Sequence, residues 1–389
     1  MRRRRLARLP LVAAASAALL LTACGNGLLS EDKAGDSSSG PILLGMLAPM
    51  SGSSAAIGPY MKNGAQLAVT EINAKGGVAG RKLELRVEDD ACDAKTATAG
   101  ANKLVTQGVK VSVGGYCSGA TLPTLPIFAK ADVPMLIPAA NSNELVNQHL
   151  PNVFLLNGTG TQQADAALAY LTKIQSARVA VMDDNTSYSK DIADLTAERL
   201  KQAGGPELAG RDSVTPGESD YSANVTAVLK TKPDTIYWTG YFQEGGLIIR
   251  QLRQAGYQGK ILVADGSVDA KLIEIAGAKS AQGVLATMTP TPETIESAKG
   301  WIQSYKATFN SDPGPYSTQS YDAVRVAAEA IRAAGSTDGK AVDKALEALK
   351  DFPTFAGPLT FTKDHTLSRG GFLILKVSDG HFVLEDSLQ

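Results

Sequence analysis

Short apolar runs alternate with amphipathic stretches along almost the whole length of this chain of 389 residues. A short apolar run bounded by turn residues favours a buried strand, whereas apolar residues at helical spacing favour a helix packed on one face. In residues 60–73, for example, Met61, Ala65, Ala68 and Ile72 recur on one helical face. Regular alternation of the two patterns indicates βαβ units, and therefore an α/β fold built on parallel sheets.

The same patterns predict individual elements. Strands are expected at 42–47, 83–87, 109–113, 135–137, 153–156, 178–182, 235–239, 261–264 and 283–287. Helices are expected at 60–73, 95–106, 122–131, 162–174, 189–203, 223–230, 245–255, 292–309, 316–334 and 339–349. Gly256 follows one of these helices and is placed to be its C′ glycine. In the tail, 371–377 and 381–384 flank Ser378-Asp379-Gly380, and Asp-Gly is a strong hairpin signal.

These elements group into two consecutive α/β blocks, roughly 41–157 and 159–288, which could be similar wound sheets. The helices after residue 290 must pack on one of them. About 350 residues would belong to the folded part, which exceeds the usual size of a single hydrophobic core. We therefore expect two lobes.

The N-terminus indicates export and anchoring. Arg2 to Arg5 form a basic region, and Leu11 to Leu21 form an apolar run too short to span a bilayer. The small residues before Cys24 resemble a bacterial lipobox, which implies a signal peptide over 1–23 and acylation of Cys24. An ordinary cleaved signal or a chance cysteine is the alternative, and the export route stays open. Residues 24–40 are small, polar and aperiodic, as in a flexible tether.

Composition narrows the classes of partner. The net charge is −1 with 20% charged residues, and no long basic run follows the signal, so nucleic acid is not an expected partner. The hydrophobic content of 44% is ordinary for a globular protein, and no second hydrophobic span occurs. A globular body on a lipid anchor is expected.

The remaining cysteines, Cys92 and Cys117, form a pair in an exported chain, where disulfides persist. A disulfide would stabilise the fold by roughly 3 kcal/mol through loop closure. Two free thiols or half of a metal site are the alternatives. The three histidines are widely separated and lack ligand spacing, so a zinc site is not expected. No other metal and no cofactor is predicted.

Catalytic motifs are missing from the sequence. No phosphate-loop motif and no H-E-x-x-H helix occur, and Gln163 stands where a dinucleotide fingerprint that starts at Gly158 would need its third glycine. Three scattered histidines make a Ser-His-Asp triad improbable. Asp89-Asp90 and Asp183-Asp184 end strands, where they could bind a ligand but more often cap a helix or lie in solvent. The sequence therefore favours binding over turnover.

Ligands of open α/β sheets bind at the carboxyl ends of the strands. Two of the loops there, 114–121 and 138–144, are rich in hydroxyls and small residues and open helices, whose free N–H groups suit a carboxylate. In the second block, Tyr241 and Asp265 follow strands. An acidic group that faces an anion-binding lobe across a cleft describes a site for a zwitterion.

Several segments resemble the leucine/isoleucine/valine-binding proteins, the solute-binding components of ABC importers for branched-chain amino acids. The resemblance covers nearly all of 41–389, and its segments are collectively strong in their order and spacing. They are Met50-Ser51-Gly52, Glu71-Ile72-Asn73-Ala74-Lys75-Gly76-Gly77, Asp89-Asp90-Ala91-Cys92-Asp93, Tyr116-Cys117-Ser118, Pro138-Ala139-Ala140, Gly217-Glu218-Ser219-Asp220-Tyr221-Ser222, Gly240-Tyr241 and Gly357-Pro358-Leu359-Thr360.

The resemblance implies a type I periplasmic-binding fold, in which two doubly wound lobes are joined by three crossovers. The crossovers would lie near 157–160, 287–290 and 365–371. Lobe 1 would comprise 41–158 and 289–366, and lobe 2 would comprise 159–288 and 367–389. Cys92 and Cys117 fall where the family has its disulfide.

The resemblance also implies roles for individual residues. Ser118 and Ala139 would hold the α-carboxylate and amine of the ligand, and Asn141 stands where the family commonly has Thr. From lobe 2, Asp265 would pair with the ammonium, where Glu is usual. Tyr188 and Tyr241 would close over the ligand.

The side-chain pocket departs further from the family pattern. Ile57 occupies a position that is often aromatic, Tyr116 one that is often Leu, and Tyr316 one that is often Phe. A pocket hydroxyl without a partner costs about 1–3 kcal/mol. The ligand therefore need not be Leu, Ile or Val. It could be a more polar or aromatic amino acid, or an acid or amide that lacks one end of the zwitterion. Tyr116 and Tyr316 facing solvent, and Asp265 capping a helix, are the structural alternatives.

The sequence thus predicts a lipid-anchored solute-binding protein of the cell envelope that closes around a small amino acid-like ligand and delivers it to ABC permease subunits. A ligand-sensing receptor module on the same fold, for amides or small carboxylic acids, is the alternative. An exported enzyme is a third and weaker hypothesis. A monomer is expected.

Overall fold

The computed structural model describes residues 40–202, 204–369 and 371–388, which belong to one compact unit. The predicted signal peptide over 1–23, the lipidation of Cys24 and the predicted tether up to residue 39 lie outside the described residues. None of the helices in the described part is long and apolar enough to cross a membrane.

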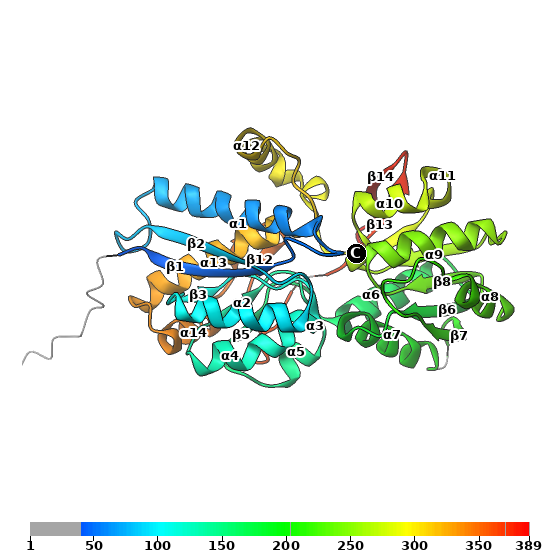
Figure 1. The fold of residues 1–389 in the computed structure, drawn as a ribbon, viewed down its shortest axis with the longest axis horizontal. Coiled ribbons are helices and arrows are strands. Elements are labelled where there is room, and N and C mark those ends of the chain that lie inside the picture. Colours follow the sequence, from blue (N-terminus) through cyan, green and yellow to red (C-terminus); the bar gives the residue numbers. More distant parts are fainter. Residues whose placement is uncertain (1–39, 203, 370, 389) are drawn as a thin grey trace, which may run out of the picture. The chain divides into compact units, whose positions relative to one another are not determined.

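The first sheet has five parallel strands in the order β2-β1-β3-β4-β5 (Figure 1). Their bounds are β1 Ile42–Ala48, β2 Leu83–Asp89, β3 Val111–Ser112, β4 Met135–Ile137 and β5 Val153–Leu155. Helices α1 and α2 lie on opposite faces of this sheet (Figure 1).

The second sheet has seven strands in the order β14-β13-β10-β9-β8-β6-β7. Their bounds are β6 Arg178–Asp183, β7 Glu207–Ser213, β8 Thr235–Trp238, β9 Lys260–Val263, β10 Leu285–Met288, β13 Leu373–Ser378 and β14 His381–Asp386. Strands β6 to β10 pair in parallel, and the hairpin β13–β14 adds two antiparallel strands to β10. A separate two-stranded ladder joins β11 (Phe352–Thr354) to β12 (Gly357–Leu359).

The two sheets repeat one topology. When strands are numbered within each block, both β2-β1-β3-β4-β5 and β7-β6-β8-β9-β10 read 2-1-3-4-5. The prediction of two similar wound blocks is therefore confirmed. In this order the chain winds away from the first strand in both directions, and the point of reversal is where such sheets bind ligands.

Helices fill the connections. The α-helices are α1 Ile57–Ala74, α2 Ala94–Thr106, α3 Ser118–Thr121, α4 Leu125–Lys130, α5 Glu144–Asn147, α6 Gly160–Lys173, α7 Ser187–Leu200, α8 Ser222–Lys230, α9 Phe242–Gln254, α10 Ala270–Ala276, α11 Ala278–Ala281, α12 Lys299–Phe309, α13 Ser317–Ala334 and α14 Gly339–Glu347. The 3-10 helices are η1 Leu122–Thr124, η2 Asp265–Ser267, η3 Pro292–Thr294 and η4 Glu296–Ala298. Helix α13 packs on α1, so the late helices cover the first block.

Side-chain caps fix several helix starts. Asp93 accepts from the backbone N of Thr96 at 2.8 Å at the start of α2, and Thr159 with Gln162 forms a capping box at the start of α6. At the other end of a helix, Gly256 follows α9 with φ of +85°, as expected for a C′ glycine.

The structure corrects some predicted elements. Strand β7 was missed because its sequence is polar and half-exposed at a sheet edge, so it carries no apolar run. The helix predicted over 292–309 begins at Lys299, after η3 and η4, because Pro292 starts a separate turn. The helix predicted over 122–131 is divided between Thr124 and Leu125 into η1 and α4, and each piece has a proline in its first turn, where a missing backbone donor is tolerated. Helices α10 and α11 were not predicted.

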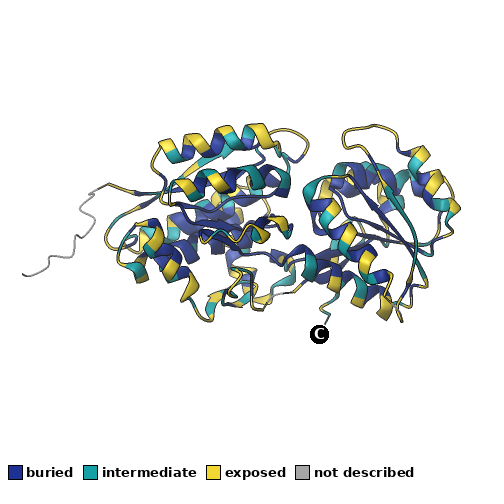
Figure 2. Cartoon of the chain, turned by 90° about the horizontal axis from the view of Figure 1, so that it is seen from below, coloured by how far each residue is buried: buried dark blue, intermediate teal, exposed yellow. Residues whose placement is uncertain are grey.

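Buried side chains gather on the strands and on the inner faces of the helices, and the outer faces of the helices are exposed (Figure 2). Val383 and Leu384 on β14 are the only large hydrophobic residues classed as exposed within the described ranges. The predicted hairpin is confirmed, with its turn at Asp379 and Gly380. Burial on both faces of the parallel strands is what their continuous apolar runs predict.

Candidate ligand-binding site

The polar side chains of the candidate site follow the carboxyl ends of strands. In the first sheet, Ser118 follows β3, and Asn141 follows β4. In the second sheet, Tyr188, Tyr241 and Asp265 follow β6, β8 and β9. The two reversal points of the strand order, β1/β3 and β6/β8, lie among these loops. Topology therefore brings the predicted residues to the edges where ligands of open sheets bind.

Ser118 is fully buried and holds the two loops of the first edge together. Its Oγ accepts hydrogen bonds from the backbone N of Asn141 at 3.3 Å and of Ser142 at 3.2 Å. The hydroxyl proton stays available as a donor. The carbonyl of Ala139 accepts from Nδ2 of Asn157 at 2.7 Å, so Ala139 takes part through its backbone.

Asn141 links the first edge to the second. Its Nδ2 donates to Oε1 of Gln163 at 2.9 Å, and Nε2 of Gln163 donates to Oδ1 of Asp265 at 2.9 Å. Oδ1 of Asn141 is buried and has no hydrogen-bond partner among the described residues. An acceptor of this kind costs free energy unless a donor reaches it.

Asp265 is the most heavily hydrogen-bonded carboxylate of the site. It is buried, and its donors are the hydroxyl of Tyr188 at 2.5 Å, the hydroxyl of Tyr316 at 2.8 Å, Nε2 of Gln163, the backbone N of Gly266 at 3.1 Å and Nδ2 of Asn157 at 3.5 Å. Burial raises the pKa of Asp265, and the hydrogen bonds from Tyr188, Tyr316, Gln163 and Asn157 oppose that rise. The site thus contains a buried carboxylate held by neutral donors.

Four tyrosines surround this carboxylate. The ring centroids lie 5.6 Å apart for Tyr116 and Tyr316, 5.8 Å for Tyr116 and Tyr241, and 5.0 Å for Tyr188 and Tyr241. The hydroxyl of Tyr116 donates to the carbonyl of Gly266 at 3.4 Å. Burial raises the pKa of all four hydroxyls, so they stay protonated and can donate. We call Asp265 with Tyr116, Tyr188, Tyr241 and Tyr316 the tyrosine cluster.

Tyr116 and Tyr316 face the cluster rather than solvent, since only 4% and 2% of their surfaces are exposed. Tyr316 directly precedes α13 with φ of +62°, a conformation that a bulky residue rarely adopts. The local backbone is therefore held by its surroundings.

Ile57 is buried as the first residue of α1. No hydrogen bond or ring contact joins it to the tyrosine cluster within the described ranges, and its role stays a prediction.

The paired aspartates at strand ends mostly serve local turns. Asp89 accepts from the backbone N of Met50, Ser51 and Ala91, and Asp183 pairs with Arg211 at 2.7 Å. Asp184 accepts from the backbone N of Thr186, and its Oδ2 is buried without a partner in the described part of the chain.

The sequence did not identify Gln163 and Asn157 as site residues. Both are fully buried polar side chains that reach Asp265, from α6 and from the end of β5. The position of Asn157 directly after a buried strand was an available signal. Gln163 lies on the inner face of a helix, where only the fold reveals what it reaches.

Cys92 and Cys117 form a disulfide, with Cα atoms 5.4 Å apart, which confirms the predicted pairing. It joins the loop after β2 to the start of α3, next to Ser118. No group of His, Cys, Asp and Glu side chains within the described ranges is placed to hold a metal ion.

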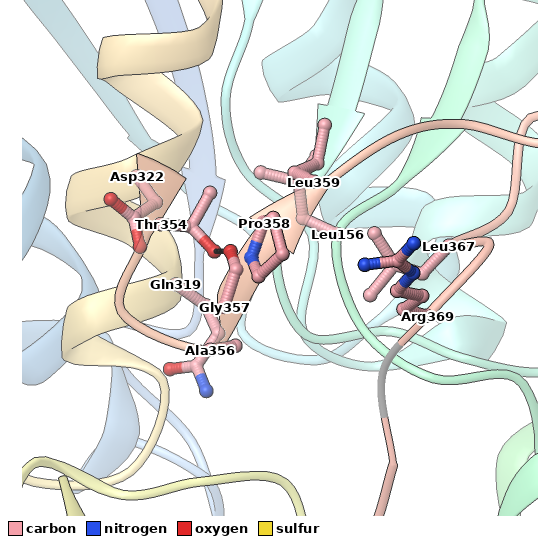
Figure 3. A pocket seen from close by; sticks show the side chains of 10 residues that line it. All are labelled: Leu156, Gln319, Asp322, Thr354, Ala356, Gly357, Pro358, Leu359, Leu367 and Arg369. Carbon is pink, nitrogen blue, oxygen red and sulfur yellow. Dashed lines mark hydrogen bonds between the residues drawn. The ribbon is translucent and has the colours of Figure 1, made fainter. Parts of the chain in front are cut away.

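A small cavity lies where the chain passes between the sheets (Figure 3). Its volume is about 20 Å³, and its walls include Leu156 after β5, Gln319 on α13, and Leu367 and Arg369 before β13. Nε2 of Gln319 also donates to the carbonyl of Pro290 at 2.8 Å, just after β10. A cavity needs about 10–15 Å³ to hold one water, so this one suits water rather than a solute.

Comparison with known proteins identifies the family and agrees with the fold. The family model described as "Periplasmic binding protein" matches residues 41–381. The chain is 37% identical over 344 residues to the Leu/Ile/Val-binding protein homolog 3 of Brucella melitensis, which covers 88% of this chain and 93% of that protein. It is 35% identical over 344 residues to the Leu/Ile/Val-binding protein BraC3 of Rhizobium johnstonii, with the same coverage.

Solved structures give the same fold. The leucine binding protein LivK of Thermotoga maritima superposes with a TM-score of 0.82 at 28% identity and covers 88% of this chain and 97% of that one. LivJ of Streptococcus pneumoniae, a branched-chain amino acid transporter substrate binding protein solved in complex with isoleucine, has a TM-score of 0.80 at 28% identity, covering 89% of this chain and 100% of that one. The chain therefore belongs to the periplasmic binding protein family and has its type I fold.

Proposed function

We propose that this protein is the solute-binding component of an ABC importer and captures a small amino acid-like ligand at the tyrosine cluster. The observation that carries the proposal is the burial of the Asp265 carboxylate next to the first edge. That edge offers the hydroxyl of Ser118 and backbone groups. A buried carboxylate suits the ammonium of an amino acid, and a helix start with a free hydroxyl proton suits its carboxylate. The relatives named for leucine, isoleucine and valine support this class of ligand.

Binding would be coupled to closure of two lobes, 41–158 with 289–366 and 159–288 with 367–389. The first set contains the five-stranded sheet and the β11–β12 ladder, and the second contains the seven-stranded sheet, so the division cuts no sheet. The proposed crossovers, 157–160, 287–290 and 365–371, run close to the cavity of Figure 3. Hinge motion about a few connecting segments is a general way for two-lobed proteins to enclose a solute.

The protein would work by binding and release and not by turnover. The permease subunits of the importer would receive the ligand. Acylation of Cys24 would hold the protein, as a monomer, at the outer face of the cytoplasmic membrane or in the periplasm. Localisation of a Cys24→Ala variant to the soluble fraction would support the anchor.

A ligand without an ammonium group is favoured by one specific observation, because five protein donors already bind the carboxylate of Asp265. The hydroxyls of Tyr116 and Tyr316 reach two adjacent residues, Gly266 and Asp265, so polar groups occupy positions that are often apolar in the family. A receptor module for amides or small carboxylic acids on this fold is therefore the second candidate.

Calorimetry and thermal shift with purified protein, refolded to remove bound solute, test both. The panel holds the twenty amino acids, short amides and aromatic acids. Because a ligand that binds only the folded state raises the melting temperature, micromolar binding of an amino acid supports the importer proposal. A response to amides or acids alone would overturn the role of Asp265 as the partner of an ammonium.

A further inference from the structure

A hollow of about 430 Å³ lies outside the tyrosine cluster and shares none of its residues. Helix α10 and the hairpin β13–β14 form one wall, and η3 with residues 314–315 forms the other. We call it the lateral hollow. Pockets that hold small molecules typically measure about 300–1000 Å³, so its volume suits a small organic molecule.

Most of the lining is apolar. Val268, Ile273, Leu375 and Phe382 lie on the wall of the seven-stranded sheet, and Pro315 lies opposite. Val383, which also lines the hollow, is 42% exposed. Apolar surface that lines a concave site favours an occupant with an apolar body.

Two carboxylates lie on opposite walls, Asp269 at the start of α10 and Glu293 in η3. Asp269 is 3% exposed. Its Oδ1 accepts from the backbone N of Lys271 at 2.8 Å, whereas its Oδ2 has no partner among the described residues. Burial raises the pKa of Tyr60, and the charges of Asp269 and Glu293 add to that rise.

No lysine or arginine of the described part neutralises these two carboxylates in an ion pair. Lys271 pairs with Glu274 at 2.6 Å and Lys306 pairs with Asp312, so the side chains of these two lysines act on Asp269 and Glu293 only through their charges. A buried carboxylate oxygen without a partner is costly, and an ammonium group from outside the chain would relieve that cost.

We propose that the lateral hollow is a second small-molecule site, for a primary amine that carries an apolar body. The ammonium would lie between Asp269 and Glu293, and the body would cover Ile273 and Phe382. Since η3 also contacts β14 across the hollow, an occupant would touch elements on both of its walls. The proposal is independent of which solute binds at the tyrosine cluster.

Isothermal titration of the whole protein with 2-phenylethylamine tests the proposal, and 2-phenylethanol is the uncharged matched ligand. The amine should bind at least about tenfold more tightly than the alcohol. Asp269→Asn keeps the helix cap and the side-chain volume, and should weaken amine binding by about tenfold. Glu198→Gln removes an exposed charge from α7, outside the hollow, and should leave amine binding unchanged.

Two further variants locate the amine. Ala270→Trp places a large ring in the hollow from an exposed position and should abolish binding. Asp265→Asn should leave amine binding intact. Equal binding of amine and alcohol, no binding at millimolar amine, or loss of binding in Asp265→Asn but not in Asp269→Asn would each overturn the proposal.

Discussion

The two sheets share one strand order but present different chemistry at their carboxyl edges. The first edge contains the Ser118 hydroxyl, helix starts and a disulfide. The side chain of its buried carboxylate, Asp90, accepts one hydrogen bond among the described residues, and the donor is the backbone N of Cys92 at 2.8 Å. At the second edge, Asp265 is equally buried and accepts five. Topology therefore gives the two edges equivalent positions in their sheets, and individual side chains give them different chemistry.

The difference also separates two kinds of buried carboxylate. Burial raises the pKa of both, but donors to Asp265 stabilise its charged form, whereas Asp90 has little to offset the cost of burial. We therefore expect substitution of Asp265 to change ligand affinity, and substitution of Asp90 to change how the free energy of unfolding depends on pH.

The largest effect is expected at Asp265. Asp265→Ala should cost about 3–5 kcal/mol of affinity for an amino acid ligand, because it leaves the ammonium buried and unpaired. Asp265→Asn keeps the shape and one acceptor oxygen but removes the charge. Calorimetry on both variants distinguishes the ligands, since an uncharged amide should tolerate Asn better than an ammonium does. Unchanged affinity in the Ala variant would end the assignment of a zwitterion site.

The disulfide of the first edge has the next largest effect. The double variant Cys92→Ala, Cys117→Ala should lower the free energy of unfolding by roughly 3 kcal/mol, because it removes a cross-link that closes a loop of 25 residues. Urea denaturation measures the change. Wild-type protein under reducing conditions is the control and should lose a similar amount. Identical urea midpoints for the variant and the oxidised wild type would contradict a stabilising role.

Much of this comparison could be predicted from the sequence. Apolar runs and turn residues predicted the parallel strands, and the rule for strand ends brought Ser118, Tyr241 and Asp265 into consideration. The fold class and the family are confirmed. Strand β7 was missed because a half-exposed edge strand has no continuous apolar run.

Contacts between distant segments could not be predicted in this way. The bonds from Gln163 and Tyr316 to Asp265 join residues 102 and 51 positions apart, and no local pattern encodes them. The lateral hollow likewise depends on how η3 approaches β14. The roles of all nine candidate residues in ligand binding stay predictions, namely those of Ile57, Tyr116, Ser118, Ala139, Asn141, Tyr188, Tyr241, Asp265 and Tyr316.

The pH dependence of the free energy of unfolding tests the role of Asp90 at the first edge. Burial raises its pKa from 3.8 to about 6, with a smaller contribution from Asp89. The folded state therefore binds this proton more tightly than the unfolded state, so the contribution of Asp90 to stability is greatest below about pH 4 and falls as pH rises to about 6. Asp90→Asn keeps the acceptor for Cys92, and should gain about 2–3 kcal/mol relative to wild type between pH 4 and pH 7.

Chemical denaturation at several pH values measures this gain. Asp93→Asn is the matched control on the same loop, because hydrogen bonds from Thr96 lower the pKa of the exposed Asp93. Its contribution to stability is present above its unfolded pKa and is lost as pH falls, the opposite of Asp90. A gain of the same sign in both variants would show that Asp90 is not the titrating group.

The smallest expected effects are the losses of stability when two tyrosines of the cluster lose their hydroxyls. The hydroxyl of Tyr316 donates to a carboxylate at 2.8 Å, and that of Tyr116 donates to a neutral carbonyl at 3.4 Å. Because hydrogen bonds to charged groups are the stronger ones, Tyr316→Phe should cost about 1.5 kcal/mol of unfolding free energy and Tyr116→Phe about 0.5 kcal/mol. Urea denaturation of both variants gives the order.

A double-mutant cycle that combines each tyrosine variant with Asp265→Asn then tests whether the hydrogen bond to Asp265 causes the difference in cost. Tyr316→Phe should be non-additive with it, because the two groups share one hydrogen bond, whereas Tyr116→Phe should be close to additive. If Tyr116 proved the costlier and more strongly coupled residue, the contact with Gly266 would hold the two edges together. The carboxylate of Asp265 would then be left free for the ligand.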